Sequence, residues 1–233
     1  MKVNNKVVSR CESALHLGHL LHTKHTNNEL IDKALKDFYT SYHSFVAKFG
    51  SCNTTTKNKL FHQYCCAMYA SHLWDMESEK ADAMLTQWRI AHRIILGIPY
   101  DAHIDILPLI ANNMPLKCIL DCKFISFYKA ISASENKMVN YMVKARLYKS
   151  SSTFGRNMGR VLRTYELNIE DIIIMNKNKI KDFCYRKWMS NISVDYQDNA
   201  RVIRDLINMK EERCTRIFMN EDCNRIMEIL STT

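Results

Sequence analysis

The chain has 233 residues, of which 47% are hydrophobic and 24% are charged, and its formal net charge is +9. This composition is ordinary for a globular protein of one or two domains, and no uncharged apolar run approaches the about 18 residues of a membrane-spanning helix. The nine Cys occur without an N-terminal signal peptide or a Cys-x-x-Cys pair, which predicts reduced thiols and a cytoplasmic or nuclear protein.

The first 27 residues favour strands. Short β-favouring runs flank Asn4-Asn5, which suits a tight turn, and the apolar run from Ala14 to Leu21 suits a returning strand. We therefore expect a small N-terminal β-hairpin. Four His recur there at every third residue: His16, His19, His22 and His25. They predict no zinc site, because neither helix nor strand geometry gathers them into a tetrahedral shell and no Cys or carboxylate pattern completes one.

Helical periodicity begins at Glu29. An apolar stripe with a period near 3.6 runs to Phe49, with Asn27 or Asn28 as its cap and Gly50 as its stop. After a polar link at residues 51–57, a helix apolar on most faces is expected from about Lys59 to Met76. Such a helix lies inside a bundle.

A third helix is expected from the cap Ser78 to a stop at Gly97 and Pro99, followed by a short element at Leu107-Pro108-Leu109. Pro115 suits the first position of the next helix, whose apolar residues continue to Ile131. Residues 138–147 resume as helix after a break at 132–136. The clearest linker, residues 150–155, precedes shorter helices expected at about 157–165, 169–175, 178–190, 196–209 and 213–230.

The charge is concentrated late in the chain. Residues 137–187 hold 12 Lys and Arg against 4 Asp and Glu. A basic surface attracts polyanions, so this segment points to nucleic acid, and the alternative is a solvated basic face without a ligand. The fold class predicted is mainly α: a helical bundle with the N-terminal hairpin and a second, basic helical C-terminal region.

Two sets of Arg are candidate phosphate ligands. Arg89 and Arg93 share one side of a helix whose Trp88, Ala91 and Ile95 face inward, and two guanidiniums on one ridge suit successive backbone phosphates. Ion pairs with a neighbouring helix are the alternative. A second amphipathic helix carries Arg156, Arg160 and Arg163. It is compatible with nucleic acid, an acidic partner or simple solvation.

Enzyme-like motifs are scarce. Cys65, Cys66, Cys118 and Cys122 fall among apolar residues, where burial makes a thiol inert. No phosphate-binding glycine loop occurs, no small-molecule substrate is evident, and no Asp-Asp pair is present. We expect no catalytic residues, no bound metal and no cofactor.

The order of several short motifs resembles the region that follows the polymerase active site in non-LTR (LINE-type) retrotransposon reverse transcriptases. The motifs are Leu17-Gly18-His19, Leu60-Phe61-His62-Gln63-Tyr64-Cys65, Leu73-Trp74, Trp88-Arg89, Gly97-Ile98-Pro99 and Leu107-Pro108-Leu109. The resemblance covers roughly the first two-thirds of the chain. It implies a primer-grip hairpin at residues 1–27, a thumb-like helical domain at 28–149 and a C-terminal helical extension at 150–233.

The resemblance also implies a function. In that family the thumb clamps the template–primer duplex, so it implies contacts to an RNA–DNA or DNA duplex during RNA-templated DNA synthesis. The nucleic-acid-binding residues expected are Leu17, Gly18, His19, Lys24, Arg89, Arg93, Arg156, Arg160 and Arg163. The parent polymerase would use Mg²⁺ held by paired aspartates, and this chain lacks them. We therefore expect a non-catalytic piece whose partner is the missing palm and fingers. The alternatives are a helical protein-interaction module and a translated remnant without function.

Overall fold

The computed structural model describes residues 28–98, 106–147, 152–192 and 197–202, together with the backbone of four short strands before residue 23. Several predicted features lie outside the described residues. They are the turn at Leu17-Gly18, Lys24, the helix expected at 213–230 and most of the helix expected at 196–209, of which residues 197–202 are helical.

The four strands pair through their backbones as two antiparallel hairpins. β1 (Lys2–Val3) pairs with β2 (Lys6–Val7), and β3 (Ser13–His16) pairs with β4 (His19–His22). One hairpin was predicted and two form, because each strand closes the shortest loop by pairing with its neighbour in sequence.

From residue 28 onward the described elements are all helical, which confirms the mainly α prediction for that part of the chain. Their bounds are α1 Asn28–Phe49, α2 Thr54–Cys65, η1 Ser71–Leu73, α3 Glu79–Leu96, α4 Ile106–Ile110, α5 Leu116–Ser132, α6 Lys137–Leu147, α7 Thr153–Tyr165, α8 Ile169–Ile174 and α9 Lys177–Ser190.

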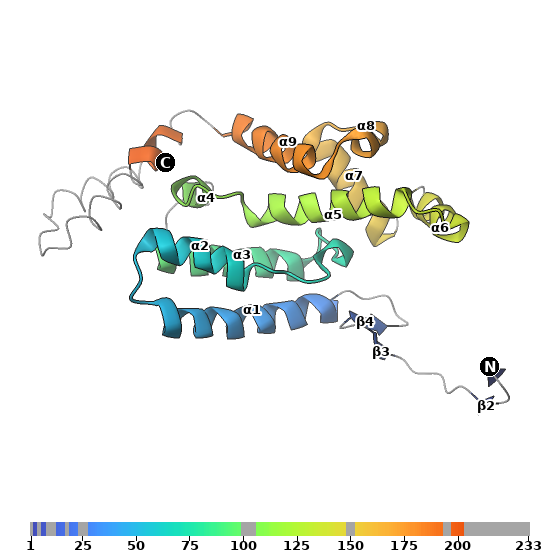
Figure 1. The fold of residues 1–233 in the computed structure, drawn as a ribbon, viewed down its shortest axis with the longest axis horizontal. Helices are drawn as coiled ribbons and strands as arrows, with labels where there is room; N and C mark the ends of the chain where they lie inside the picture. The colour runs from blue at the N-terminus through green and yellow to red at the C-terminus, as the bar shows by residue number, and fades with distance from the viewer. Residues whose placement is uncertain are drawn as a thin grey trace, which may run out of the picture.

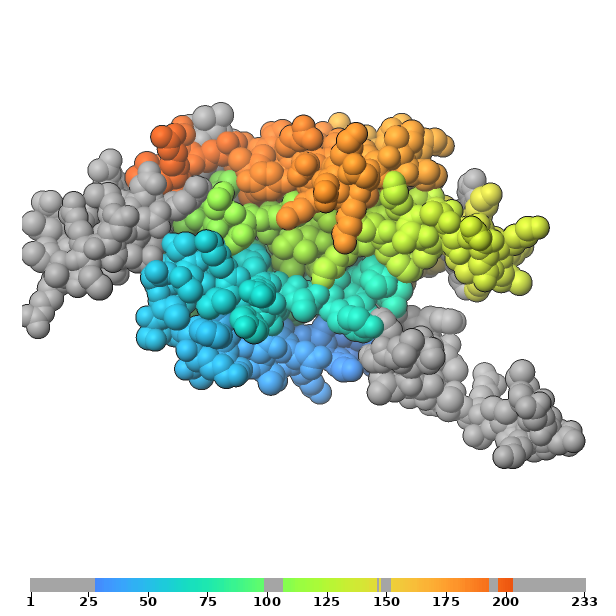
Figure 2. Space-filling model, in the orientation of Figure 1, coloured from blue at the N-terminus to red at the C-terminus, as the bar shows by residue number. Residues whose placement is uncertain are grey.

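The helices stack in layers (Figure 1). Helix α1 forms one outer layer, α2 and α3 lie between α1 and α5, and α7, α8 and α9 cover the other side of α5. The same layers follow one another in the space-filling view, from the blue α1 to the orange α9 (Figure 2). Helix α5 is therefore the central element of the molecule.

Two large apolar clusters meet along α5. The first joins α1, α2 and α3 around Phe61 and Trp74 and reaches α5 through Leu116 and Leu120. The second joins α5 to α7, α8 and α9, and it begins at Phe124, one turn beyond Leu120. Helices on both sides of residue 150 thus share α5, while the domain boundary predicted there falls between described segments and stays a prediction.

Local capping explains why α3 begins and ends where the sequence predicted. The Ser78 hydroxyl accepts a hydrogen bond from the backbone N–H of Ala81 at 3.3 Å. Gly97 adopts φ +65° at the C-terminus, a left-handed conformation that glycine takes without steric cost.

The predicted helix from Lys59 to Met76 is wrong in its second half. Helix α2 starts earlier, at Thr54, and ends at Cys65; an irregular segment follows, with Met68 and Ala70 at positive φ. Tertiary hydrogen bonds replace the helical ones. The Lys123 ammonium donates to the carbonyl oxygens of Ala67 and Met68. Apolar periodicity alone does not reveal such partners.

Candidate nucleic-acid interface

Helix α3 carries both Arg89 and Arg93. Trp88, Ala91 and Ile95 are buried in the first apolar cluster, which confirms that this face points inward. Arg89 and Arg93 are both half-buried beside that face. The helix thus holds two guanidiniums four residues apart on one rigid ridge, about 6 Å along its axis.

Helix α7 divides its three Arg between different environments. Arg163 is on the surface, with its side chain 75% exposed and 3.9 Å from a carboxylate oxygen of Glu77. Arg156 forms an ion pair with Asp75 in the segment before α3. Arg160 points into the protein, so the prediction of three Arg on one exposed face is wrong for this residue.

Arg160 is held by an internal carboxylate. One Nη of Arg160 lies 3.2 Å from Oδ2 of Asp121 on α5, and the other bonds to Oδ1, which makes the pair bidentate. The Tyr165 hydroxyl donates to the same carboxylate at 2.9 Å. The Asp121 side chain is only 1% exposed, and a buried charge of this kind requires such partners. Arg160 therefore joins α7 to α5.

A buried polar chain ties α2, α3 and the loop before α5 together. His92 Nε2 lies 3.0 Å from the Asn58 side-chain oxygen, and the Asn58 amide donates to the carbonyl of Ala111 at 2.8 Å. The rings of His62 and His92 are 5.2 Å apart. Burial lowers the pKa of His62 to about 4. Burial, followed by the charge of His62, lowers the pKa of His92 to about 3. Both are therefore neutral and structural at pH 7.

Of the four thiols predicted to be buried, Cys65, Cys66 and Cys118 are buried and Cys122 is only partly buried. Burial raises the pKa of Cys65 to about 11 and that of Cys66 to about 12. Burial likewise raises the pKa of Cys118 to about 12. Thiols with such pKa values are protonated at pH 7 and make poor nucleophiles or metal ligands. Among the described residues, no group of three or more His, Cys, Asp or Glu side chains converges to hold a metal ion.

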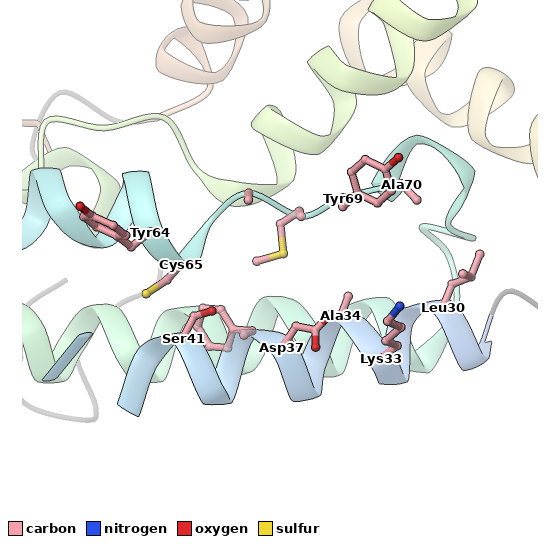
Figure 3. A pocket seen from close by; sticks show the side chains of 12 residues that line it. Leu30, Lys33, Ala34, Asp37, Ser41, Tyr64, Cys65, Tyr69 and Ala70 are labelled. Atoms are coloured by element: carbon pink, nitrogen blue, oxygen red, sulfur yellow. The ribbon is translucent and has the colours of Figure 1, made fainter. Parts of the chain in front are cut away.

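A groove runs between α1 and the chain that leaves α2 (Figure 3). Its volume is about 180 Å³. Tyr64 and Tyr69 line the side opposite α1, and they are 56% and 67% exposed. Lys33 and Asp37 of α1 lie across from them. Exposed aromatic rings are surfaces on which unpaired bases stack.

Behind the same chain segment lies a larger, basic cavity of about 490 Å³. Lys123 of α5 and Lys177 and Lys181 of α9 line it. Neither these lysines nor the two tyrosines were predicted as binding residues, although Tyr64 belongs to one of the quoted motifs. The four-residue spacing of Lys177 and Lys181 within the basic segment was the available signal. Their position beside residues 67–72, more than a hundred positions away in the sequence, results from the tertiary fold.

The remaining predicted residues are only partly described. His19 is the first residue of β4, and its backbone alone is described. Leu17, Gly18 and Lys24 lie outside the described residues. Their assignment to a primer grip stays a prediction.

The chain matches no protein-family model, no curated protein and no solved structure. None of the helices in the described part of the chain has both the length and the apolar composition needed to cross a membrane.

Proposed function

We propose that this chain is a non-catalytic helical module that binds nucleic acid duplexes through their phosphates. The observation that carries the proposal is the concentration of cations in residues 137–187, which contain 12 Lys and Arg but only 4 Asp and Glu. Many of these side chains lie on the described surface. The exposed ones are Lys137, Lys144, Arg163, Lys177, Lys179, Lys181 and Arg186. Such a surface attracts a polyanion without reading its sequence.

The ridge of Arg89 and Arg93 on α3 would add fixed phosphate contacts to this diffuse attraction. The resemblance of residues 1–149 to a reverse-transcriptase primer grip and thumb favours an RNA–DNA hybrid or a DNA duplex as the ligand. In this proposal the polymerase chemistry and its Mg²⁺ belong to a palm that carries paired aspartates. Arg160 has no part in the contact, because Asp121 holds it inside.

The test is the salt dependence of duplex binding by the full chain, measured by fluorescence anisotropy on a DNA duplex and on an RNA–DNA hybrid. Replacing both Arg89→Ala and Arg93→Ala should weaken binding and reduce the slope of log K against log salt by about 0.9 for each phosphate that the variant no longer neutralises. The matched control replaces Lys48→Ala and Lys59→Ala, which removes the same charge from exposed sites on α1 and α2. If both variants give the same slope of log K against log salt, Arg89 and Arg93 do not contact phosphates. If the affinity of the natural chain does not depend on salt, the proposed function is wrong.

A second candidate function is a protein-interaction module, and helix α6 favours it. Met138, Tyr141 and Met142 are 65%, 71% and 56% exposed, and they lie three and four residues apart on one side of the helix. An exposed apolar stripe of this kind is typical of protein interfaces. Size-exclusion chromatography of the chain with and without nuclease treatment separates the two candidates. A complex that nuclease dissolves supports nucleic acid, and one that survives supports a protein partner.

A further inference from the structure

The basic cavity has two walls that are far apart in sequence. Residues 67–72 form one wall, the first turns of α9 form the other, and α5 is the floor. Two lysines of α5 fasten these walls. Lys123 donates to the carbonyls of Ala67 and Met68, and Lys129 donates to the carbonyls of Ile173 and Met175 at the junction of α8 and α9. The cavity is therefore built into the fold.

Its electrostatics favour an anion. Lys123, Lys177 and Lys181 line it, and no carboxylate is among the described residues of its lining. Lys177 and Lys181 are exposed and form no ion pair within the described part of the chain. Three like charges in one hollow repel one another, so an anion bound among them relieves that repulsion. Lys123 uses two of the three donors of its ammonium group, which leaves one for a ligand.

The start of a long helix also lines the cavity. Lys177 and Asn178 are the first two residues of the 14-residue α9, so the positive end of that helix dipole faces the cavity. Helix N-termini favour phosphate groups.

The rest of the lining is apolar. Met68, Met114 and Ile119 contribute to it, and the volume of about 490 Å³ is ordinary for a small-molecule site. Inorganic phosphate alone would leave this apolar surface uncovered. A ligand that joins a phosphate to a flat ring system satisfies both halves of the lining.

We propose that this cavity binds a nucleoside monophosphate, either free or as the phosphorylated end of a nucleic acid strand. The phosphate lies among Lys123, Lys177 and Lys181, and the base lies against the methionines. This site shares Lys177 and Lys181 with the basic surface of the proposed duplex contact, and it goes beyond that contact because it needs neither Arg89 nor Arg93.

Isothermal titration of the full chain tests the proposal with AMP, adenosine, and one oligonucleotide bearing either a 5′-phosphate or a 5′-hydroxyl. AMP or the phosphorylated strand should bind at least about tenfold more tightly than its unphosphorylated counterpart, as charge-assisted hydrogen bonds predict. Preference for AMP identifies a free nucleotide as the ligand, and preference for the phosphorylated strand identifies a strand end. Equal binding with and without phosphate, or no binding by either phosphorylated probe, would overturn the proposal.

Variants locate the site. The double variant Lys177→Ala with Lys181→Ala should lower the affinity for the preferred phosphorylated probe at least about tenfold. Lys179→Ala, an exposed lysine of the same helix outside the lining, should change its affinity less than about twofold. Loss of duplex binding in the Arg89 and Arg93 variant with retained AMP binding would show that the two sites fail independently.

Discussion

Arg160 shows how one residue on a regular pattern can have a different role from its neighbours. In the sequence, Arg156, Arg160 and Arg163 recur at helical spacing and form a basic face. In the fold, Arg160 turns inward because Asp121 lies opposite it on α5, 39 positions earlier in the chain. The spacing is the same for solvated and for internally paired arginines. Only the position of the carboxylate distinguishes them, and that position depends on the packing of α7 on α5.

The first prediction concerns this ion pair. Arg160→Ala leaves the buried Asp121 carboxylate without its main partner, so it should lower the free energy of unfolding by about 3–5 kcal/mol. Arg163→Ala, three residues further along α7 and exposed, should change it by less than about 0.5 kcal/mol. Urea denaturation of both variants measures the difference. Equal destabilisation would contradict the buried pair.

The second prediction follows from the two buried imidazoles. The pKa of His62 is lowered to about 4 and that of His92 to about 3, against about 6.5 in the unfolded chain. Below pH 6.5 the two imidazoles bind protons in the unfolded chain but stay neutral in the folded protein until the pH nears their lowered pKa values. Stability is therefore full above pH 6.5 and falls as the pH drops towards 4, by about 1.4 kcal/mol per pH unit for each fully neutral imidazole.

The comparison that isolates this effect uses His62→Gln. Urea denaturation at pH 7.5 and at pH 5 should show a smaller loss of stability for this variant than for the natural chain. His43→Gln, on the exposed face of α1, is the matched control and should keep the natural pH dependence. A His43 variant with the shallower dependence would place the effect elsewhere.

At the scale of elements, capping and breaker residues predicted the helix ends well. Ser78 and Gly97 bound α3, and Gly50 follows α1. Pro115, predicted at the first helical position of α5, lies one residue earlier, at its N-cap. These are local signals, so the sequence contains them. The end of α2 at Cys65 has no such signal. There the irregular chain up to residue 78 is stabilised by side chains of α5 and α7, and the sequence alone does not show that these helices lie next to it.

The third prediction tests how that segment is held. The Asn157 side chain of α7 accepts a hydrogen bond from the backbone N–H of Met76 at 3.2 Å and donates to the carbonyl of Trp74 at 2.6 Å. Asn157→Ala leaves two buried backbone groups unpaired, at about 1–3 kcal/mol each. Amide hydrogen exchange should therefore accelerate in residues 66–78, which have little other secondary structure.

The control for that measurement is Asn140→Ala. The Asn140 amide also donates to a backbone carbonyl, that of Ser134 at 2.7 Å, but the bond spans only six residues and lies near the start of α6. This variant should leave exchange in residues 66–78 unchanged. Faster exchange there in both variants would mean that the segment responds to overall stability and not to Asn157.

At the scale of the whole molecule, the sequence predicted the helical class and the uneven charge, because both are sums over local composition. It also placed Arg89 and Arg93 on one helix, but it did not predict the groove or the basic cavity. The groove at Tyr64 and Tyr69 and the cavity at Lys177 and Lys181 exist because the segment after α2 leaves the helical path and is bound by side chains of α5 and α7. The proposed nucleotide cavity thus depends on contacts between the two parts of the chain.

The last prediction tests whether those halves are independent. A domain boundary near residue 150 predicts that residues 1–149 fold alone. The shared core predicts the opposite, because removing α7, α8 and α9 exposes Phe124, Ile125 and Tyr128 and deprives Asp121 of Arg160. Each exposed side chain forfeits about 1.5–3 kcal/mol, a large part of the usual total of about 5–15 kcal/mol. Residues 1–149 should therefore show no cooperative thermal transition by circular dichroism, whereas residues 1–202, which keep the whole cluster, should show one. A sharp transition in the shorter chain would establish the boundary and would make the α5 contacts a docking surface between two domains.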